Sequence, residues 1–210
     1  MKSLILDIDH TMVYSDMLGG NKDIVENSFK VQVGDKNILV HKRPFLLEFL
    51  RMVSDHFDIY SYTSGGRDYA NAILDQLEFE VGSKIFKGRY SNEHCEYLFI
   101  PMPWGGSMSN SFKDISKLGF EKKTTIVLDD STDVYRKQFY NVIRIRGYTG
   151  DEKDDHLDQV LPFILSLKDA VDVRPEIKKY NEKQFPSVYE EKTLIGTFFL
   201  NPLELDEALK

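Results

Sequence analysis

The sequence predicts an α/β fold in which a mostly parallel central sheet is flanked by helices. Short apolar runs alternate with stretches of helical apolar spacing, in the order strand, hairpin, helix, strand, helix, and then strand, helix, strand, helix. Several of the apolar runs end directly in acidic or hydroxyl residues. Reactive groups in open parallel sheets gather beyond the carboxyl ends of the strands, so we expect a functional site where these runs end.

The first strand is predicted at residues 4–6, a short apolar run of the kind that is buried on both faces of a sheet. Apolar and polar residues then alternate over 29–33, a turn follows at 34–37, and residues 38–40 are again apolar. This pattern predicts a β-hairpin inserted after the first strand, within about residues 12–42. It fits a flap over the site and a purely structural hairpin equally well.

Helical spacing of apolar residues predicts helices over about residues 46–53, 69–77 and 157–167. The first of them begins just beyond Pro44, since the first turn of a helix tolerates proline. Apolar runs at 57–62, 85–86, 124–128 and 142–145 predict further strands, and the arginines that interrupt the last run indicate a sheet edge.

Two segments are expected to lie outside this regular pattern. Residues 96–112 contain Pro101 and Pro103, which cannot continue a helix or an interior strand, and are predicted to form an irregular lid loop that carries the only tryptophan. Residues 174–210 are predicted to be a C-terminal extension, with a short terminal helix capped at Asn201 and Pro202. The extension either packs on the domain or offers a surface for homo-oligomerisation.

Composition excludes several classes of protein. With 210 residues and 41% apolar content the chain can bury a proper core, and its net charge of −7 argues against bulk binding to nucleic acid or to an anionic membrane. The single cysteine, Cys95, excludes an intrachain disulfide and fits a reducing compartment. No apolar run is long enough to span a membrane, and the first strand leaves no room for a signal peptide, so a soluble protein of the cytoplasm or nucleus is expected.

The most informative stretch is the end of the first strand, where Asp7 and Asp9 flank one residue. Such a pair can divide catalytic work between a nucleophile and a proton donor and acceptor, although an ordinary acidic loop gives the same pattern. Later strand ends and loops add Thr63, Lys113 and a second acidic pair at residues 129–130. Together these groups meet the needs of phosphate-monoester hydrolysis through a covalent intermediate, because a cation held by acids, a lysine and a hydroxyl can offset the charge of the phosphate.

At these residues the chain resembles the haloacid dehalogenase superfamily, and more closely the phosphatases of the polymerase C-terminal domain, the NLI-interacting-factor-like family. The resemblance runs from Leu4 to about Val173 and implies a phosphatase domain of residues 1–173 with a Rossmann-type sheet. Its motifs are 7–11 (DIDHT), 42–44 (KRP), 48–50 (EFL), 62–64 (YTS) with 69–70 (YA), 113–119 (KDISKLG), 128–131 (LDDS), Asp155, and 157–167.

The resemblance implies roles for individual residues. Asp7 would be the nucleophile that becomes aspartyl phosphate, and Asp9 would be the general acid and then base, with its backbone carbonyl on Mg²⁺. Thr63 and Lys113 would hold the phosphate. The implied metal ligands are Asp7, Asp9, Asp129 and Asp130, and the implied substrate-binding residues are Thr11, Thr63, Ser64, Arg89 and Lys113.

The chain departs from the family pattern at individual residues, in the stretch 96–112, which looks longer than its counterpart, and in the tail after Pro175, which has no counterpart. Asp130 stands where relatives usually carry asparagine, and His10 stands where an acidic residue or glutamine is common. Relatives often place an arginine near the position of Cys95, for which Arg89 is the substitute candidate here. These departures concern the substrate more than the reaction.

Three hypotheses about function follow. The first is a Mg²⁺-dependent protein serine/threonine phosphatase whose partner is a phosphorylated protein or peptide. The second keeps the chemistry and takes a small phosphorylated metabolite or a nucleic-acid end as its substrate. The third is a non-catalytic binding module, against which the presence of all the acidic residues argues.

Overall fold

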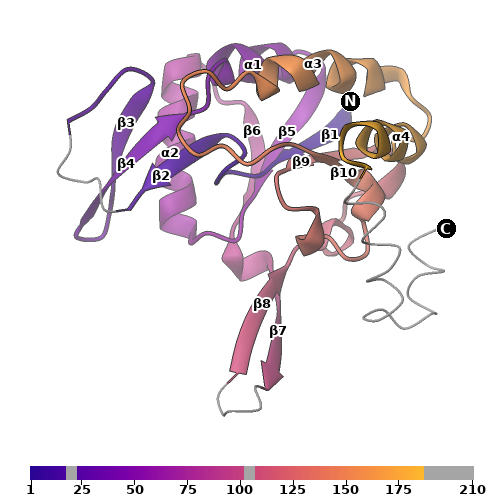
Figure 1. Cartoon of the computed structure of the whole chain (residues 1–210), viewed down its shortest axis with the longest axis horizontal. Helices are drawn as coiled ribbons and strands as arrows, with labels where there is room; N and C mark the ends of the chain where they lie inside the picture. The colour runs from indigo at the N-terminus through magenta and orange to yellow at the C-terminus, as the bar shows by residue number, and fades with distance from the viewer. Residues whose placement is uncertain (18–22, 102–106, 187–210) are drawn as a thin grey trace.

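The central sheet of the protein is parallel and has five strands. A computed structural model of the chain describes residues 1–17, 23–101 and 107–186. The sheet has the order β10-β9-β1-β5-β6, and each neighbouring pair is parallel, as the sequence predicts (Figure 1). Its strands are β1 (Lys2–Leu6), β5 (Phe57–Tyr62), β6 (Phe86–Tyr90), β9 (Thr125–Asp129) and β10 (Val142–Arg144).

Alternate residues of β1 divide the core between the two faces of this sheet. Leu4 and Leu6 belong to a large apolar cluster with residues of all four α-helices, whereas Ile5 belongs to a smaller one with Tyr62 and Ile115. One face is therefore covered by α-helices and the other largely by short 3₁₀ turns and loops. The helices are α1 (Leu46–Ser54), α2 (Arg67–Val81), α3 (His156–Ser166) and α4 (Arg174–Gln184). The 3₁₀ turns are η2 (Asn92–His94), η3 (Ile115–Leu118), η4 (Lys122–Thr124), η5 (Thr132–Val134), η6 (Phe139–Asn141) and η7 (Leu167–Asp169).

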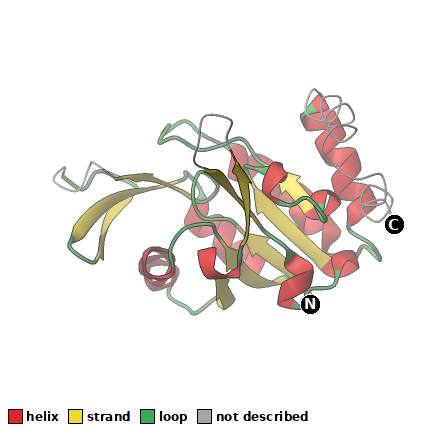
Figure 2. Cartoon of the chain, turned by 90° about the horizontal axis from the view of Figure 1, so that it is seen from below, coloured by secondary structure: helices red, strands yellow, loops and turns green. Residues whose placement is uncertain are grey.

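The segment inserted after β1 is a three-stranded antiparallel sheet. The predicted hairpin is present as β3 (Ser28–Val33) and β4 (Lys36–Lys42), joined at Gly34, whose φ of 58° suits glycine in a tight turn. A strand that the sequence pattern did not reveal, β2 (Val13–Asp16), pairs with the other side of β4. Figures 1 and 2 show this small sheet standing out to one side of the body.

The prediction of an irregular loop over 96–112 was wrong. Residues on both sides of the undescribed stretch 102–106 form strands β7 (Glu96–Pro101) and β8 (Ser107–Phe112), which pair in antiparallel register and project from the body (Figure 1). Pro101 ends β7, so the proline limits the strand without preventing it. Pro103 and Trp104 lie outside the described residues.

The predicted boundary at residue 174 is also corrected by the structure. Helix α4 packs on edge strand β10, because the Asn181 side chain donates to the carbonyl of Val142 (2.7 Å) and accepts from the backbone N–H of Arg144 (3.1 Å). Ile177 and Asn181 are both fully buried. The domain thus includes α4, while the predicted terminal helix and its surface for homo-oligomerisation lie outside the described residues. Each helix of the described chain is too short or too polar to cross a lipid bilayer.

Candidate active site

The candidate site is built by the parallel register of the three central strands. Leu6 of β1 lies opposite Leu128 of β9 on one side and Ser61 of β5 on the other. The next residues along each strand therefore reach the same edge of the sheet, and the backbone N–H of Asp7 donates to the carbonyl of Leu128 (3.0 Å). Asp7, Thr63 and Asp129 consequently meet at the carboxyl edge, as expected for an open α/β sheet.

Lys113 joins this edge from the base of the β7–β8 hairpin. Its Nζ lies 2.6 Å from Asp7 Oδ1 and 2.8 Å from Asp129 Oδ2, and all three side chains are buried. The backbone N–H of Lys113 donates to the carbonyl of Val134 (2.8 Å), which fixes the position of the lysine after β8. Residues 106 positions apart in the sequence thus share one buried ion-pair network.

The charges of this cluster are unbalanced. Carboxylate oxygens of Asp7, Asp129 and Asp130 lie within 4.8 Å of one another, with Lys113 as the buried cation among them. Burial raises the pKa of Asp7, and raises that of Asp129 to about 7. Burial alone would lower the pKa of Lys113, but the charges of Asp129 and Asp7 outweigh it and raise that pKa well above its usual value. Three clustered carboxylates offer the oxygen ligands that a hard divalent cation prefers, so the donor set fits such an ion.

Asp9 lies beside this cluster and has a different environment. Its Oδ1 accepts a hydrogen bond from the hydroxyl of Tyr69 on α2. Burial raises the pKa of Asp9, while the Tyr69 hydrogen bond and the charge of His10 oppose the increase. A carboxyl group with a raised pKa holds its proton more readily than an ordinary aspartate does, which suits general acid–base work.

The predicted hydroxyl residues lie at the same edge but differ in exposure. Thr11 is buried, and its Oγ1 accepts a hydrogen bond from the backbone N–H of Asp130 (3.1 Å), so it ties together the two acidic loops. Thr63 is also buried, and its Oγ1 accepts from the N–H of Gly65 (2.9 Å) just before α2. Ser64 is exposed.

Arg89 is not part of the cluster. Its guanidinium donates to the carboxylates of Asp75 (2.7 Å) and Glu78 (2.8 Å) and to Asn71 (3.3 Å), all on α2. Two carboxylates already neutralise this arginine, and burial of Glu78 makes the pairing costly to break. Because Arg89 is already paired on α2, its position does not support the predicted role in binding substrate.

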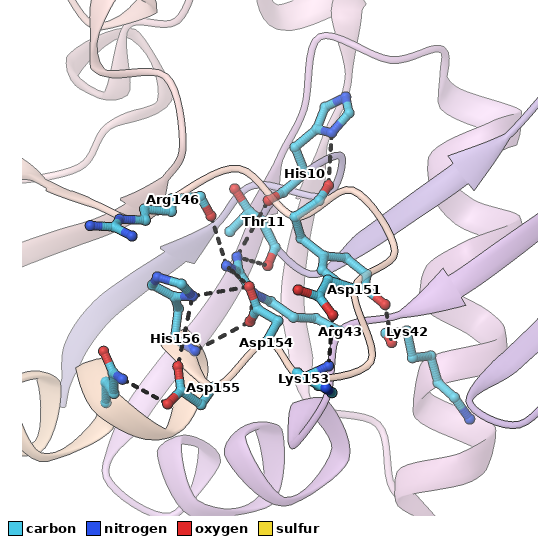
Figure 3. Close-up of polar contacts among 12 residues, drawn as sticks. His10, Thr11, Lys42, Arg43, Arg146, Asp151, Lys153, Asp154, Asp155 and His156 are labelled. Atoms are coloured by element: carbon cyan, nitrogen blue, oxygen red, sulfur yellow. Dashed lines mark hydrogen bonds and ion pairs between the residues drawn. The ribbon is translucent and has the colours of Figure 1, made fainter.

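A buried arginine that the sequence reasoning left without a role supports the loop after β1. The fully buried side chain of Arg43 forms a bidentate pair with Asp154 (2.6 and 2.8 Å) and donates to the carbonyls of Thr11 (3.1 Å) and Arg146 (2.7 Å) (Figure 3). The ring nitrogen Nδ1 of His156 lies 3.0 Å from the same Asp154 carboxylate. The Arg-Pro pair at residues 43–44, directly after an apolar strand, was the sequence feature that could have indicated this role. The residue that pairs with Arg43, Asp154, precedes the Asp155 of the sequence motif.

The loop after β1 is also fixed through His10. This residue has a φ of 60°, a left-handed conformation that is uncommon outside glycine. Its carbonyl accepts from the N–H of Tyr148 (2.7 Å), and its Nδ1 lies 2.9 Å from the Tyr148 carbonyl. The strained turn between Asp9 and Thr11 is therefore held from the 146–154 segment at several points.

The fold and the site together define a haloacid dehalogenase-like α/β protein, with carboxylates after its central strand and a buried lysine between them. A solved structure of a variant of the fission yeast RNA polymerase II CTD phosphatase Fcp1, bound to beryllium fluoride, is similar, with a TM-score of 0.52 and 19% sequence identity, covering 86% of this chain and 54% of that chain. The chain belongs to the NLI interacting factor-like phosphatase family, whose sequence model matches residues 2–174.

Curated relatives agree with this membership. The chain is 32% identical over 176 residues to CTD small phosphatase-like protein 2 of Dictyostelium discoideum, covering 84% of this chain and 29% of the relative. It is 33% identical over 176 residues to nuclear envelope morphology protein 1 of Schizosaccharomyces pombe, covering 82% and 34% respectively. It is 30% identical over 186 residues to the CTD nuclear envelope phosphatase 1 homolog of Caenorhabditis elegans, covering 85% and 71%. The chain thus spans about a third of the length of the first two relatives.

Proposed function

We propose that the chain is a Mg²⁺-dependent phosphomonoesterase that dephosphorylates serine or threonine in proteins through an aspartyl-phosphate intermediate. The observation that carries the proposal is the buried network in which Lys113 Nζ contacts both Asp7 (2.6 Å) and Asp129 (2.8 Å) at the carboxyl edge of the sheet. Family membership supports the phosphatase reaction, and the names of the relatives as CTD phosphatases favour a phosphoprotein partner.

The proposed reaction begins with attack by Asp7 on phosphorus. Lys113 holds Oδ1 of Asp7, which leaves the other carboxylate oxygen to form the new P–O bond. As the bond from phosphorus to the serine or threonine oxygen breaks, Asp9 gives its proton to that oxygen. Asp9 then takes a proton from water as the water oxygen attacks the aspartyl phosphate, which releases inorganic phosphate and restores Asp7.

Lys113 and Thr63 bind the phosphate in this proposal. An ammonium group has three N–H donors, and Asp7 and Asp129 accept two of them, so one remains for a phosphate oxygen. Asp7, Asp129, Asp130 and the carbonyl of Asp9 would hold the Mg²⁺, which supplies positive charge that reduces repulsion between an anionic nucleophile and the phosphate. Asp130, in place of the asparagine usual in relatives, would add a negative charge to the ion's ligands.

The test is phosphate release from a panel of phosphoserine and phosphothreonine peptides, with and without Mg²⁺, compared with nucleotides, sugar phosphates and end-phosphorylated oligonucleotides. Asp7→Asn is expected to lower kcat at least about a thousandfold, because the nucleophile is lost, while the thermal melt stays cooperative. Asp158→Asn, on the exposed first turn of α3, is the matched control and should keep full activity.

Each alternative result has a definite meaning. Full activity of the Asp7→Asn variant would refute the assigned nucleophile. Activity confined to nucleotides, sugar phosphates or oligonucleotide ends would replace the protein substrate by a small or nucleic-acid one. Binding of phosphopeptides without any turnover, at all Mg²⁺ concentrations, would favour a non-catalytic module.

A further inference from the structure

A pocket opens where the β7–β8 hairpin joins the body, next to the candidate active site. The hairpin follows β6 and returns directly into Lys113, so its base lies at the same edge of the sheet as Asp7 (Figure 1). The pocket has a volume of about 260 Å³. Its walls come from the hairpin base, the lysine segment and the stretch after η5: Glu96, Tyr97, Leu98, Phe112, Lys113, Asp114, Arg136, Lys137 and Gln138.

Arg136 is a positively charged residue of the pocket wall whose side chain is available to bind a ligand. Its guanidinium carbon lies 3.7 Å from the centroid of the Phe112 ring, so the cation stacks on the hairpin base while the residue stays exposed. Arg136 takes part in none of the ion pairs found among residues 1–17, 23–101 and 107–186. An arginine held flat with its N–H groups free is suited to binding an anionic group through two hydrogen bonds.

The other charged groups of the pocket already have partners. Glu96 is paired with Lys117, and Asp114 accepts hydrogen bonds from the Gln138 side chain (2.7 Å) and lies 3.8 Å from Lys137 Nζ. The two carboxylates in the walls are therefore neutralised, and they do not cancel the field of Arg136. Lys113 is likewise paired, with Asp7 and Asp129, so among the described residues of the pocket wall Arg136 is the charged group without an ion-pair partner.

The pocket and the phosphate-binding end of the site share one residue, Lys113. Lys113 belongs to the pocket wall, and the hydrogen bond from its backbone N–H to Val134 joins the hairpin end to the segment that carries Arg136. Tyr135, between these two residues in sequence, is buried with its ring 5.4 Å from Lys113 Nζ. A peptide that presents a phosphate to Lys113 would therefore pass the pocket.

We propose that this pocket is a specificity subsite for an anionic side chain next to the phosphorylated residue of the substrate. The anion, a carboxylate or a second phosphate, pairs with Arg136. Leu98, 42% exposed, lies on the same face of β7 as Glu96, the cross-strand partner of Phe112, and forms an apolar wall against which the neighbouring part of the peptide packs. The inference rests on the proposed phosphatase function and adds to it the class of phosphopeptide that the site prefers.

The experiment compares kcat/KM for three phosphoserine peptides that differ only beside the phosphoserine, with alanine, aspartate or a second phosphoserine there. The wild-type chain should prefer the charged peptides by roughly three- to fivefold, the size that a partly exposed charge pair supplies, and the preference should shrink as salt is raised. Arg136→Gln should reduce the preference to within about twofold, Arg136→Lys should keep part of it, and Arg136→Glu should reverse it.

Controls separate the subsite from the reaction. Arg51→Gln removes an exposed arginine of α1 and should keep the wild-type preference. Hydrolysis of p-nitrophenyl phosphate, which has no flanking residues, is measured for every variant and reports the phosphate site alone. An unchanged preference in Arg136→Gln, or no preference in the wild-type chain, would overturn the subsite while the phosphatase function stands.

Failure of the proposed function gives a different result. If the wild-type chain hydrolyses neither the peptides nor p-nitrophenyl phosphate, the subsite is tested by fluorescence anisotropy of labelled peptides on chains with Asp7→Asn. The Asp7→Asn variant is compared with the double variant Asp7→Asn, Arg136→Gln. Weaker binding of the charged peptides to the double variant would support the subsite even though the phosphatase function had failed, and equal binding to both variants would overturn the subsite. A difference between the aspartate and second-phosphate peptides identifies which anion is preferred.

Discussion

Replacing Asp154 by asparagine should expose how much the buried Arg43 pair contributes to stability. The Arg43 side chain is 0% exposed and that of Asp154 is 8% exposed, and two hydrogen bonds of 2.6 and 2.8 Å join them. Removing one partner of a buried pair costs about 3–5 kcal/mol. The carbonyls of Thr11 and Arg146 still accept from the guanidinium, so we expect the lower end, about 3 kcal/mol.

The assay is urea unfolding followed by circular dichroism, with the thermal midpoint as a second measure. For a chain of this size a loss of about 3 kcal/mol corresponds to roughly 6–12 °C in Tm. Asp172→Asn is the matched control, because the Asp172–Arg174 pair has side chains 26% and 22% exposed and should contribute at most about 1 kcal/mol. A loss below about 1 kcal/mol for Asp154→Asn would refute the view that this pair supports the loop after β1.

The pH dependence provides an independent check on the same pair. Burial alone would raise the pKa of Asp154, but the hydrogen bond and charge of Arg43 outweigh it, so the net pKa is lowered. The stabilisation is therefore fully present above the unfolded-state pKa of about 3.9 and is lost as the pH falls through the lower folded-state pKa. The stability difference between wild type and Asp154→Asn should stay constant from pH 8 to about 5 and narrow below about pH 4. A difference that widens on acidification would contradict the assignment.

Three further predictions follow from other contacts. Asn181→Ala should lower stability by about 2 kcal/mol, because it leaves two backbone groups of β10 unpaired, and an unchanged urea midpoint would show that α4 is not needed by the sheet. Tyr69→Phe removes a hydrogen bond that lowers the pKa of Asp9, so the high-pH limb of the kcat/KM profile, which requires protonated Asp9, should move upward; a downward shift would contradict the proton-donor role. Saturating Mg²⁺ should raise Tm in wild type and in Asp158→Ala but much less in Asp130→Ala, and equal shifts would exclude Asp130 as a ligand.

The central fold was predictable because its strands are encoded locally. The apolar runs at the cores of β1 and β9 are buried on both faces and are continuous hydrophobic stretches, whereas β5 alternates buried with partly buried residues and was recognisable from its aromatic and β-branched content. Parallel order then followed from the alternation with amphipathic segments, and the convergence of polar residues followed from parallel order. The edge position of β10 was visible as well, since arginines interrupt its pattern.

The elements that sequence reasoning missed depend on partners distant in the chain. Strand β2 is a mixed four-residue segment that pairs only with β4, and β8 has the composition SMSNSF, which is weakly β-forming without β7 beside it. Helix α4 has only two buried residues, and one of them is a polar asparagine whose bonds to β10 leave no trace in an apolar pattern. The partners of Arg43 and Arg89 were hidden for the same reason, because both pairs are set by tertiary packing.

The β7–β8 hairpin leaves and re-enters the body at a single point, since Glu96 and Phe112 face each other as the first pair of its ladder. Residues can therefore be added to or removed from its far end without changing the path of the chain at Lys113. The length of the hairpin can thus change without moving the reacting groups at the sheet edge. Proteins with this fold can therefore acquire new recognition surfaces through insertions in the hairpin while their reacting groups stay in place.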